Sequence, residues 1–118
     1  KGAELNPVIA PLSGETIIQK HFPNSFRETV LLNALKTAQV EQVVICGAMS
    51  HMCIDATTRA AADLGVACVV VHDACATRDL EFEEKTVIAS DVHASFMAAL
   101  GSAYAQVISC SAFFAEAA

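Results

Sequence analysis

With 118 residues, of which 54% are hydrophobic, the chain is long enough for one domain with a buried core and too short for two ordinary domains. The formal net charge of -6 is spread along the sequence without a Lys/Arg cluster, which argues against nucleic acid and anionic membranes as partners. The longest apolar run, residues 66–71, is too short to cross a bilayer, and the sequence shows no signal-peptide pattern, so we expect a cytoplasmic protein.

Short β-branched runs alternate with helix-like segments after an irregular start. Residues 1–14 contain Pro7, Pro11 and Gly14 and indicate no regular element. In chain order we expect a strand at residues 15–19, a helix at 26–38, a strand at 43–46, a helix at 52–64 that ends at Gly65, a strand at 67–71, a helix at 83–103 and a strand at 105–108.

The two middle strands are apolar at nearly every position, which is typical of a parallel sheet covered by helices on both faces. The alternation of strands and helices favours right-handed crossovers and hence an open α/β sheet. We therefore predict a single domain over residues 1–118, with a three-layer α-β-α architecture and a mainly parallel, Rossmann-like open sheet. In such sheets the chemistry takes place at the carboxyl ends of the strands.

The stretch GAMSHMCIDATTRAA, residues 47–61, places Cys53 where the second predicted strand turns into a helix. Backbone N–H groups and the positive end of the helix dipole favour a thiolate there. Cys53 is therefore a candidate nucleophile, with N–H groups of residues 49–53 as oxyanion donors; the alternative is a buried thiol that only packs. The five cysteines lack C-x-x-C spacing, which argues against disulfides and a structural zinc site.

Lys20 directly follows the first predicted strand, so we expect its side chain to face the same crevice as Cys53. A partly desolvated lysine could stabilise a thiolate and take part in proton transfer. The alternative is a solvated lysine on a loop.

The four histidines offer weaker candidates. His51 and His72 are alternative bases for a Cys-His pair, or hydrogen-bonded structural residues, and His21 and His93 lack a motif. The H-x-C spacing of His51 and Cys53 is a weak metal signal because no companion ligand pair is evident, so we expect no metal and no other cofactor.

Three further polar residues lie near the predicted crevice. Asp73 closes the third strand and either orients a partner or caps the following turn. On the second predicted helix, Thr57 is expected to pack and Arg59 to form a surface or interface ion pair.

Three stretches, KHFPNSF, VVICGAMSHMCIDATTRAAADLG and VVVHDACATRDLEF, together resemble the isochorismatase-like cysteine hydrolases over nearly the whole chain. The strongest element is an ordered pattern, G-x-x-[ST]-x-x-C-[VI]-x-x-T, joined to an upstream lysine followed by Ser-Phe. It is met here by Lys20, Ser25, Phe26, Gly47, Ser50, Cys53, Ile54 and Thr57.

The resemblance implies an Asp-Lys-Cys triad that acts on amides and related bonds, within a six-stranded, mainly parallel sheet. Carried over by motif, Cys53 is the nucleophile and Lys20 the triad lysine. The resemblance also implies a cis peptide bond between Ala48 and Met49, and an oxyanion hole made by the N–H groups of Met49 and Cys53. Family members are commonly dimers or larger, so we expect a homo-oligomer that acts on a small molecule.

The triad aspartate has no counterpart upstream of Lys20. Glu4 and Glu15 are the only acids there, and neither follows an apolar strand. We therefore expect the chain to be the C-terminal two-thirds of a hydrolase domain whose first strand and general acid/base precede Lys1. The alternative is a short relative that takes an acid from elsewhere. We expect weak or absent turnover by this chain alone, with residual alkylation of Cys53.

The sequence thus predicts a cysteine hydrolase that cleaves an amide C–N bond of a small molecule through a thioester on Cys53. Residues 1–19 lack the metal-ligand cluster that nicotinamidases of the family carry. One alternative is a non-catalytic or truncated member that serves as an oligomeric or ligand-binding domain. Others are an isochorismatase-type vinyl ether hydrolase and a redox-sensing thiol, the last disfavoured by the missing C-x-x-C partner.

Overall fold

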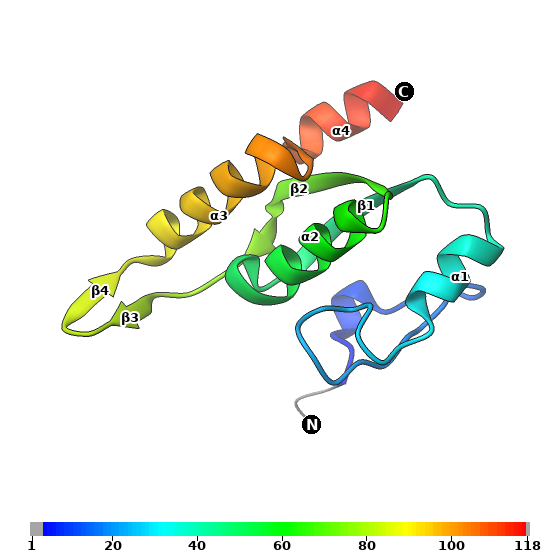
Figure 1. Cartoon of the computed structure of the whole chain (residues 1–118), viewed down its shortest axis with the longest axis horizontal. Coiled ribbons are helices and arrows are strands. Elements are labelled where there is room, and N and C mark those ends of the chain that lie inside the picture. The colour runs from blue at the N-terminus through cyan, green and yellow to red at the C-terminus, as the bar shows by residue number, and fades with distance from the viewer. Residues whose placement is uncertain (1–3, 118) are drawn as a thin grey trace.

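The central sheet has three parallel strands, β1 (Gln42–Ala48), β2 (Ala67–Ala76) and β5 (Gln106–Ile108), in the order β1-β2-β5. The computed structural model describes residues 4–117 of the chain (Figure 1). As the middle strand, β2 is buried from Cys68 to Val71, because it has a strand on each side and helices over both faces. This arrangement confirms the predicted mainly parallel, three-layer α/β architecture.

Eight further elements complete the fold within residues 4–117. They are the short 3-10 helix η1 (Pro7–Ile9), α1 (Leu31–Thr37), the π-helical turn η2 (Ser50–Ile54), α2 (Asp55–Asp63), the antiparallel hairpin of β3 (Leu80–Phe82) and β4 (Lys85–Val87), α3 (Ala89–Ala103) and α4 (Cys110–Ala117). None of the helices within residues 4–117 has the length and hydrophobicity needed to cross a bilayer.

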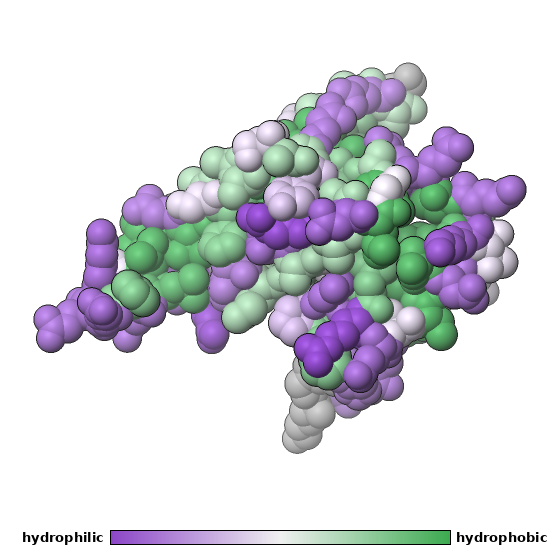
Figure 2. Space-filling model, in the orientation of Figure 1, coloured by the Kyte–Doolittle hydropathy of each residue, from purple (hydrophilic) through white to green (hydrophobic). Residues whose placement is uncertain are grey.

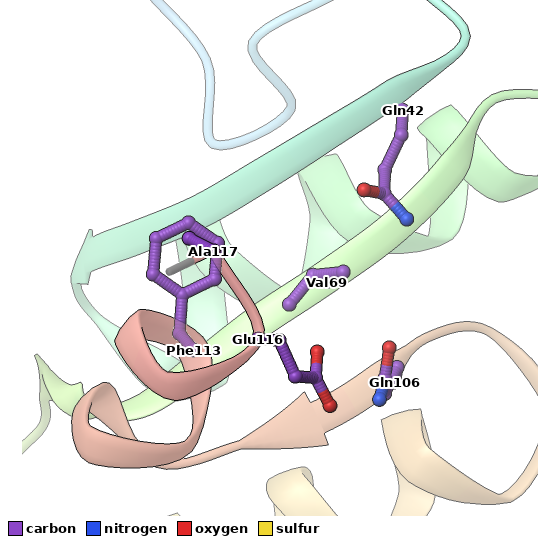
Figure 3. A pocket seen from close by; sticks show the side chains of 6 residues that line it. All are labelled: Gln42, Val69, Gln106, Phe113, Glu116 and Ala117. Atoms are coloured by element: carbon purple, nitrogen blue, oxygen red, sulfur yellow. The ribbon is translucent and has the colours of Figure 1, made fainter.

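The hydrophobic core lies on one face of the sheet. Ile45, Val70 and Val107 are register partners across the three strands, and they pack with Ile54 of η2 and Leu100 of α3. The opposite face lies under α4 at the C-terminal end of the chain (Figures 1 and 3). The helices therefore form two layers with the sheet between them, and η2 joins the core directly.

A bulge interrupts the pairing of β1 with β2 at the end where the site forms. Ile45 pairs with Val70, but Gly47 pairs with Cys75, so four residues of β2 stand opposite Cys46 alone. Gly47 has a φ of +127°, a value that side-chain-bearing residues rarely adopt. The strand-to-helix turn predicted here thus starts from a backbone shape that favours glycine.

The predicted strand at residues 15–19 is wrong, because the segment has no regular secondary structure. Within residues 4–117 the sheet ends at β1, so no strand pairs with this segment. The segment folds locally instead: Leu12 donates its N–H to the Glu15 carboxylate over 2.7 Å. A short β-branched run forms a strand only when a neighbour accepts its hydrogen bonds.

The predicted helices differ at their starts. Helix α1 begins at Leu31 and not at Phe26, because Glu28 adopts a φ of +52° that interrupts helical geometry. Helix α3 begins at Ala89, since the preceding residues form the β3–β4 hairpin, with Glu83 at a φ of +54° in its turn.

Two other helical features bear on the predictions. The predicted helix 52–64 corresponds to η2 and α2, followed by Gly65 at a φ of +87°, the left-handed conformation expected of a glycine after a helix. Helix α4 was not predicted, although Ser109 precedes its eight residues and accepts the Ala112 N–H over 3.1 Å as an N-cap.

Candidate active site

Cys53 lies in η2, the turn that leads from the carboxyl end of β1 into α2. The peptide bond between Ala48 and Met49, just before this turn, is cis. Ser50, His51 and Ile54 are buried, whereas Cys53 is half-buried and Met52 is exposed. The core thus fixes the turn from one side and leaves the thiol within reach of solvent.

Lys20 reaches Cys53 from a loop. Its Nζ donates hydrogen bonds to Cys53 Sγ over 3.2 Å, to the Phe22 carbonyl over 2.8 Å and to the Pro23 carbonyl over 3.2 Å. These three acceptors use all three N–H groups of an ammonium. The arrangement therefore places a fully hydrogen-bonded cation directly against the sulfur.

A single hydroxyl joins the Lys20 loop to the helix that follows Cys53. Thr57 Oγ1 on α2 accepts the Ser25 N–H over 3.0 Å and lies 3.0 Å from Ser25 Oγ and 3.3 Å from the Pro23 carbonyl. Thr57 was expected to pack, and these bonds were not predicted. The signal available was that Ser25 and Thr57 both belong to the ordered pattern around Lys20 and Cys53.

The turn itself is fastened to α3 and to the end of β2. Ser50 Oγ lies 2.7 Å from His93 Nδ1 and donates to the Ala76 carbonyl over 3.4 Å. His51 Nδ1 lies 2.7 Å from Thr77 Oγ1. The hydrogen bond to Ser50 gives His93 a structural role in holding the turn.

The histidines proposed as alternative bases have other surroundings. His51 is 9% exposed; it faces Thr77 through Nδ1 and Phe96 through its ring edge, and its Nε2 has no hydrogen-bond partner among residues 4–117. In the same part of the chain, no hydrogen bond joins His72 or His21 to Cys53. The described geometry thus pairs the thiol with Lys20 and with no imidazole.

Asp73 and Arg59 act outside the thiol site. Asp73 accepts the Cys110 N–H over 2.7 Å and so caps the distant α4, not the turn that follows β2. Arg59 pairs with Asp55 over 2.9 Å on α2, and this hydrogen bond raises the pKa of the exposed Arg59 guanidinium. Its guanidinium also lies 4.7 Å from the centre of the Tyr104 ring.

The other thiols differ from Cys53 in their environment. All five cysteines are free. Burial raises the pKa of Cys68 and of Cys75, since removal from water disfavours the thiolate. Cys46 is exposed on β1.

Residues 4–117 contain no group of three His, Cys, Asp or Glu side chains able to hold a metal ion. No carboxylate of these residues forms a salt bridge with Lys20.

Two hollows differ in their relation to the thiol. An open one of about 660 Å³ adjoins Lys20 and is lined mainly by apolar and amide side chains: Leu5, Ile17, Ile18, Gln19, Lys20 and His21. Another, of about 280 Å³, lies between α4 and the opposite face of the sheet, and none of its lining residues belongs to η2 or to the Lys20 loop (Figure 3). The hollow beside Lys20 therefore shares that residue with the thiol site, although Cys53 itself lines neither hollow.

Comparison with known proteins connects this geometry to a family. Residues 1–103 match the model of the isochorismatase domain. An uncharacterized isochorismatase family protein of Bacillus subtilis is 50% identical over 113 residues, covering 96% of this chain and 63% of the relative. A streptothricin hydrolase of Streptomyces noursei is 38% identical over 79 residues, covering 67% of this chain and 29% of the relative.

The fold has a close counterpart among solved structures. A crystal structure from Oleispira antarctica, assigned to the isochorismatase hydrolases, has a TM-score of 0.94 and 54% sequence identity. The match covers 97% of this chain and 60% of that structure. The chain therefore spans roughly three-fifths of the length of these relatives.

Proposed function

This chain belongs to the isochorismatase family, and from that premise we propose that it carries the nucleophile of a cysteine hydrolase. The substrate is a small molecule with an amide C–N bond. The observation that carries the proposal is the 3.2 Å hydrogen bond from Lys20 Nζ to Cys53 Sγ at the carboxyl end of the sheet. The similarity to a streptothricin hydrolase supports a hydrolytic role.

The reaction follows from the groups around the sulfur. The Lys20 ammonium stabilises the Cys53 thiolate, which attacks the acyl carbon and forms a C–S bond while the carbonyl electrons move to oxygen. The N–H groups of Met49 and Cys53 hold this oxyanion. Its collapse breaks the C–N bond, and the amine leaves with a proton from a general acid. Water then attacks the thioester, releases the carboxylic acid and restores the thiol.

We propose that the general acid/base is an aspartate in a part of the native protein that precedes Lys1, so that residues 1–118 form the C-terminal two-thirds of one hydrolase domain. Two observations support this proposal. Lys20 has no carboxylate partner among residues 4–117, and the chain spans only 63% of the B. subtilis relative. On this basis, the chain alone keeps its nucleophile but turns substrate over weakly.

The proposal also includes assembly into a homo-oligomer. Large apolar side chains are exposed at both ends of the molecule (Figure 2). Phe82 and Ile88 are exposed near the hairpin, and Val30 and Val44 on the side of α1. Such surface is typical of protein interfaces. Light scattering of the purified native protein tests this part, and a monomer at micromolar concentration contradicts it.

The central test is substitution of the thiol in the native protein that contains this chain. Cys53→Ala should lower the hydrolysis of a panel of small amides by at least about 10³-fold, because the acyl group loses its acceptor. The matched control is Cys46→Ala, which removes an exposed thiol outside the site and should leave the rates unchanged. Equal hydrolysis by wild-type protein and Cys53→Ala removes the proposal, and a vinyl ether hydrolase that does not need the thiol then becomes the better explanation.

A second measurement needs no substrate. Iodoacetamide should alkylate Cys53 faster than the exposed Cys46, as mapped by peptide mass spectrometry at pH 7, because the Lys20 ammonium favours the thiolate. Equal rates at the two thiols contradict activation of Cys53.

A further inference from the structure

We propose that the hydroxyl of Thr57 is the group that positions Lys20 against Cys53. This inference deepens the proposed function and rests on it, since it concerns the same cation and thiol. Thr57 touches neither Lys20 nor Cys53 through a hydrogen bond, so its role is positioning.

The loop that carries Lys20 needs such a tether. Residues 15–30 contain no helix or strand, so the backbone ladder that fixes β1 and η2 does not extend to Lys20. The Lys20 ammonium itself bonds to the carbonyls of Phe22 and Pro23, which belong to the same loop. These two bonds fold the loop around the ammonium but do not attach it to the rest of the protein.

Thr57 supplies the attachment. Its Oγ1 accepts the Ser25 N–H over 3.0 Å and donates to the Pro23 carbonyl over 3.3 Å, and Ser25 Oγ, 3.0 Å away, can donate its own proton to the remaining lone pair. A hydroxyl has one proton and two lone pairs, so one side chain can hold both sides of this turn. The loop is thereby bound to α2 through two backbone groups, one on each side of Asn24.

The Pro23 carbonyl links the tether to the cation. This oxygen accepts hydrogen bonds from both Lys20 Nζ and Thr57 Oγ1, at 3.2 Å and 3.3 Å. Because Thr57 follows Cys53 by four residues, the sulfur and the tether lie about one helical turn apart on the same side. The same helix start therefore carries both the Cys53 nucleophile and the Thr57 hydroxyl that binds the Lys20 loop.

Packing is the competing explanation, and the neighbouring residue separates the two. Thr57 also lines an apolar hollow of about 200 Å³ between α1, α2 and β1, where valine would fill the same space. Thr58 is 0% exposed, and its hydroxyl has no hydrogen-bond partner among residues 4–117. The Thr57 hydroxyl thus binds the loop, whereas the hydroxyl of the adjacent Thr58 does not.

The experiment compares Thr57→Val, Thr57→Ser and Thr58→Val in the native protein. The readouts are the rate of Cys53 alkylation by iodoacetamide relative to Cys46, and the melting temperature. Thr57→Val should slow the alkylation of Cys53 about tenfold, because the cation is no longer held at the sulfur. Thr57→Ser keeps the hydroxyl and should stay within about twofold of wild type, and Thr58→Val should match wild type.

A double-mutant cycle with Lys20→Met distinguishes positioning from a general structural role. If Thr57 acts through Lys20, Thr57→Val should slow the alkylation of Cys53 no further once Lys20 is methionine. Additive losses, a wild-type rate in Thr57→Val, or an equal loss in Thr58→Val overturns the inference. If Lys20→Met itself leaves Cys53 reactivity unchanged, the proposed function fails instead.

Should Thr57→Val fail to fold, amide hydrogen exchange in the wild-type protein takes its place. The Ser25 N–H should then be protected by its bond to Thr57, should keep that protection in Thr57→Ser and should lose it selectively in Thr57→Ala. An unprotected Ser25 amide in wild type overturns the inference.

Discussion

Cys53 and Lys20 meet at 3.2 Å, but the two segments that bring them there are held in different ways. The turn with Cys53 is part of the core: Ile54 packs against α3, and Ser50 is fully buried. The loop with Lys20 has no regular structure and is bound to α2 mainly through one threonine hydroxyl. Substitutions in the core around the Cys53 turn should therefore lower stability, whereas substitutions that release the Lys20 loop should lower the reactivity of the thiol.

The largest expected effect on stability lies on the core side. Leu100→Ala should reduce the free energy of unfolding by about 3 kcal/mol, because it opens a cavity where a fully buried side chain packs against Val70. Ile17, which is 64% exposed near the Lys20 loop, provides the contrast. Ile17→Ala should change the free energy by less than about 0.5 kcal/mol. Chemical denaturation measures both, and similar losses would break the distinction between the two regions.

A smaller effect is expected where the core holds the cysteine turn. His93→Ala leaves the buried Ser50 hydroxyl with only the longer bond to Ala76, and should cost about 1–2 kcal/mol. The matched control is Ser95→Ala, an exposed position on the same helix. Denaturant midpoints compare the two, and a loss for His93→Ala no larger than that of the control would show that the bond does not fasten the turn.

The smallest effect concerns pH and the buried thiol of β2. Because burial raises the pKa of Cys68 above its ordinary value of 9.0, the unfolded thiol ionises first as pH rises. The contribution of the protonated Cys68 thiol to the free energy of unfolding is therefore fully present below pH 9. It is lost as the pH rises through the raised pKa of the folded state. The free energy of unfolding should thus fall less steeply with pH, once the pH exceeds 9.0, in Cys68→Ala than in wild type. Identical slopes in urea denaturation would contradict the shift.

The sequence predicted the elements whose apolar pattern leaves little choice. The runs around Val43 and Val69 gave β1 and β2, and the cysteine at the helix start followed from the turn between them. Gly65 likewise marked the end of α2. In these places local pattern and tertiary packing favour the same structure, so pattern alone was sufficient.

Lys20 was expected beside Cys53 for a reason that the structure does not support. A strand at residues 15–19 was expected to place Lys20, but that segment is irregular. The Lys20 loop is held instead by hydrogen bonds between Ser25 and Thr57. Side-chain to backbone bonds across 32 residues leave no periodic signal. The β3–β4 hairpin was missed for a related reason, since its turn depends on the left-handed backbone of Glu83, a residue that normally favours helix.

The open side of β1 has a consequence for handling the protein. Within residues 4–117 this strand pairs only with β2, and Val44 on it is 46% exposed. A β-branched strand with a free edge is a template on which further chains can stack and precipitate. Residues 42–48 are therefore the segment from which aggregation of this chain should start. Val44→Lys is the substitution we expect to raise the yield of soluble material most directly.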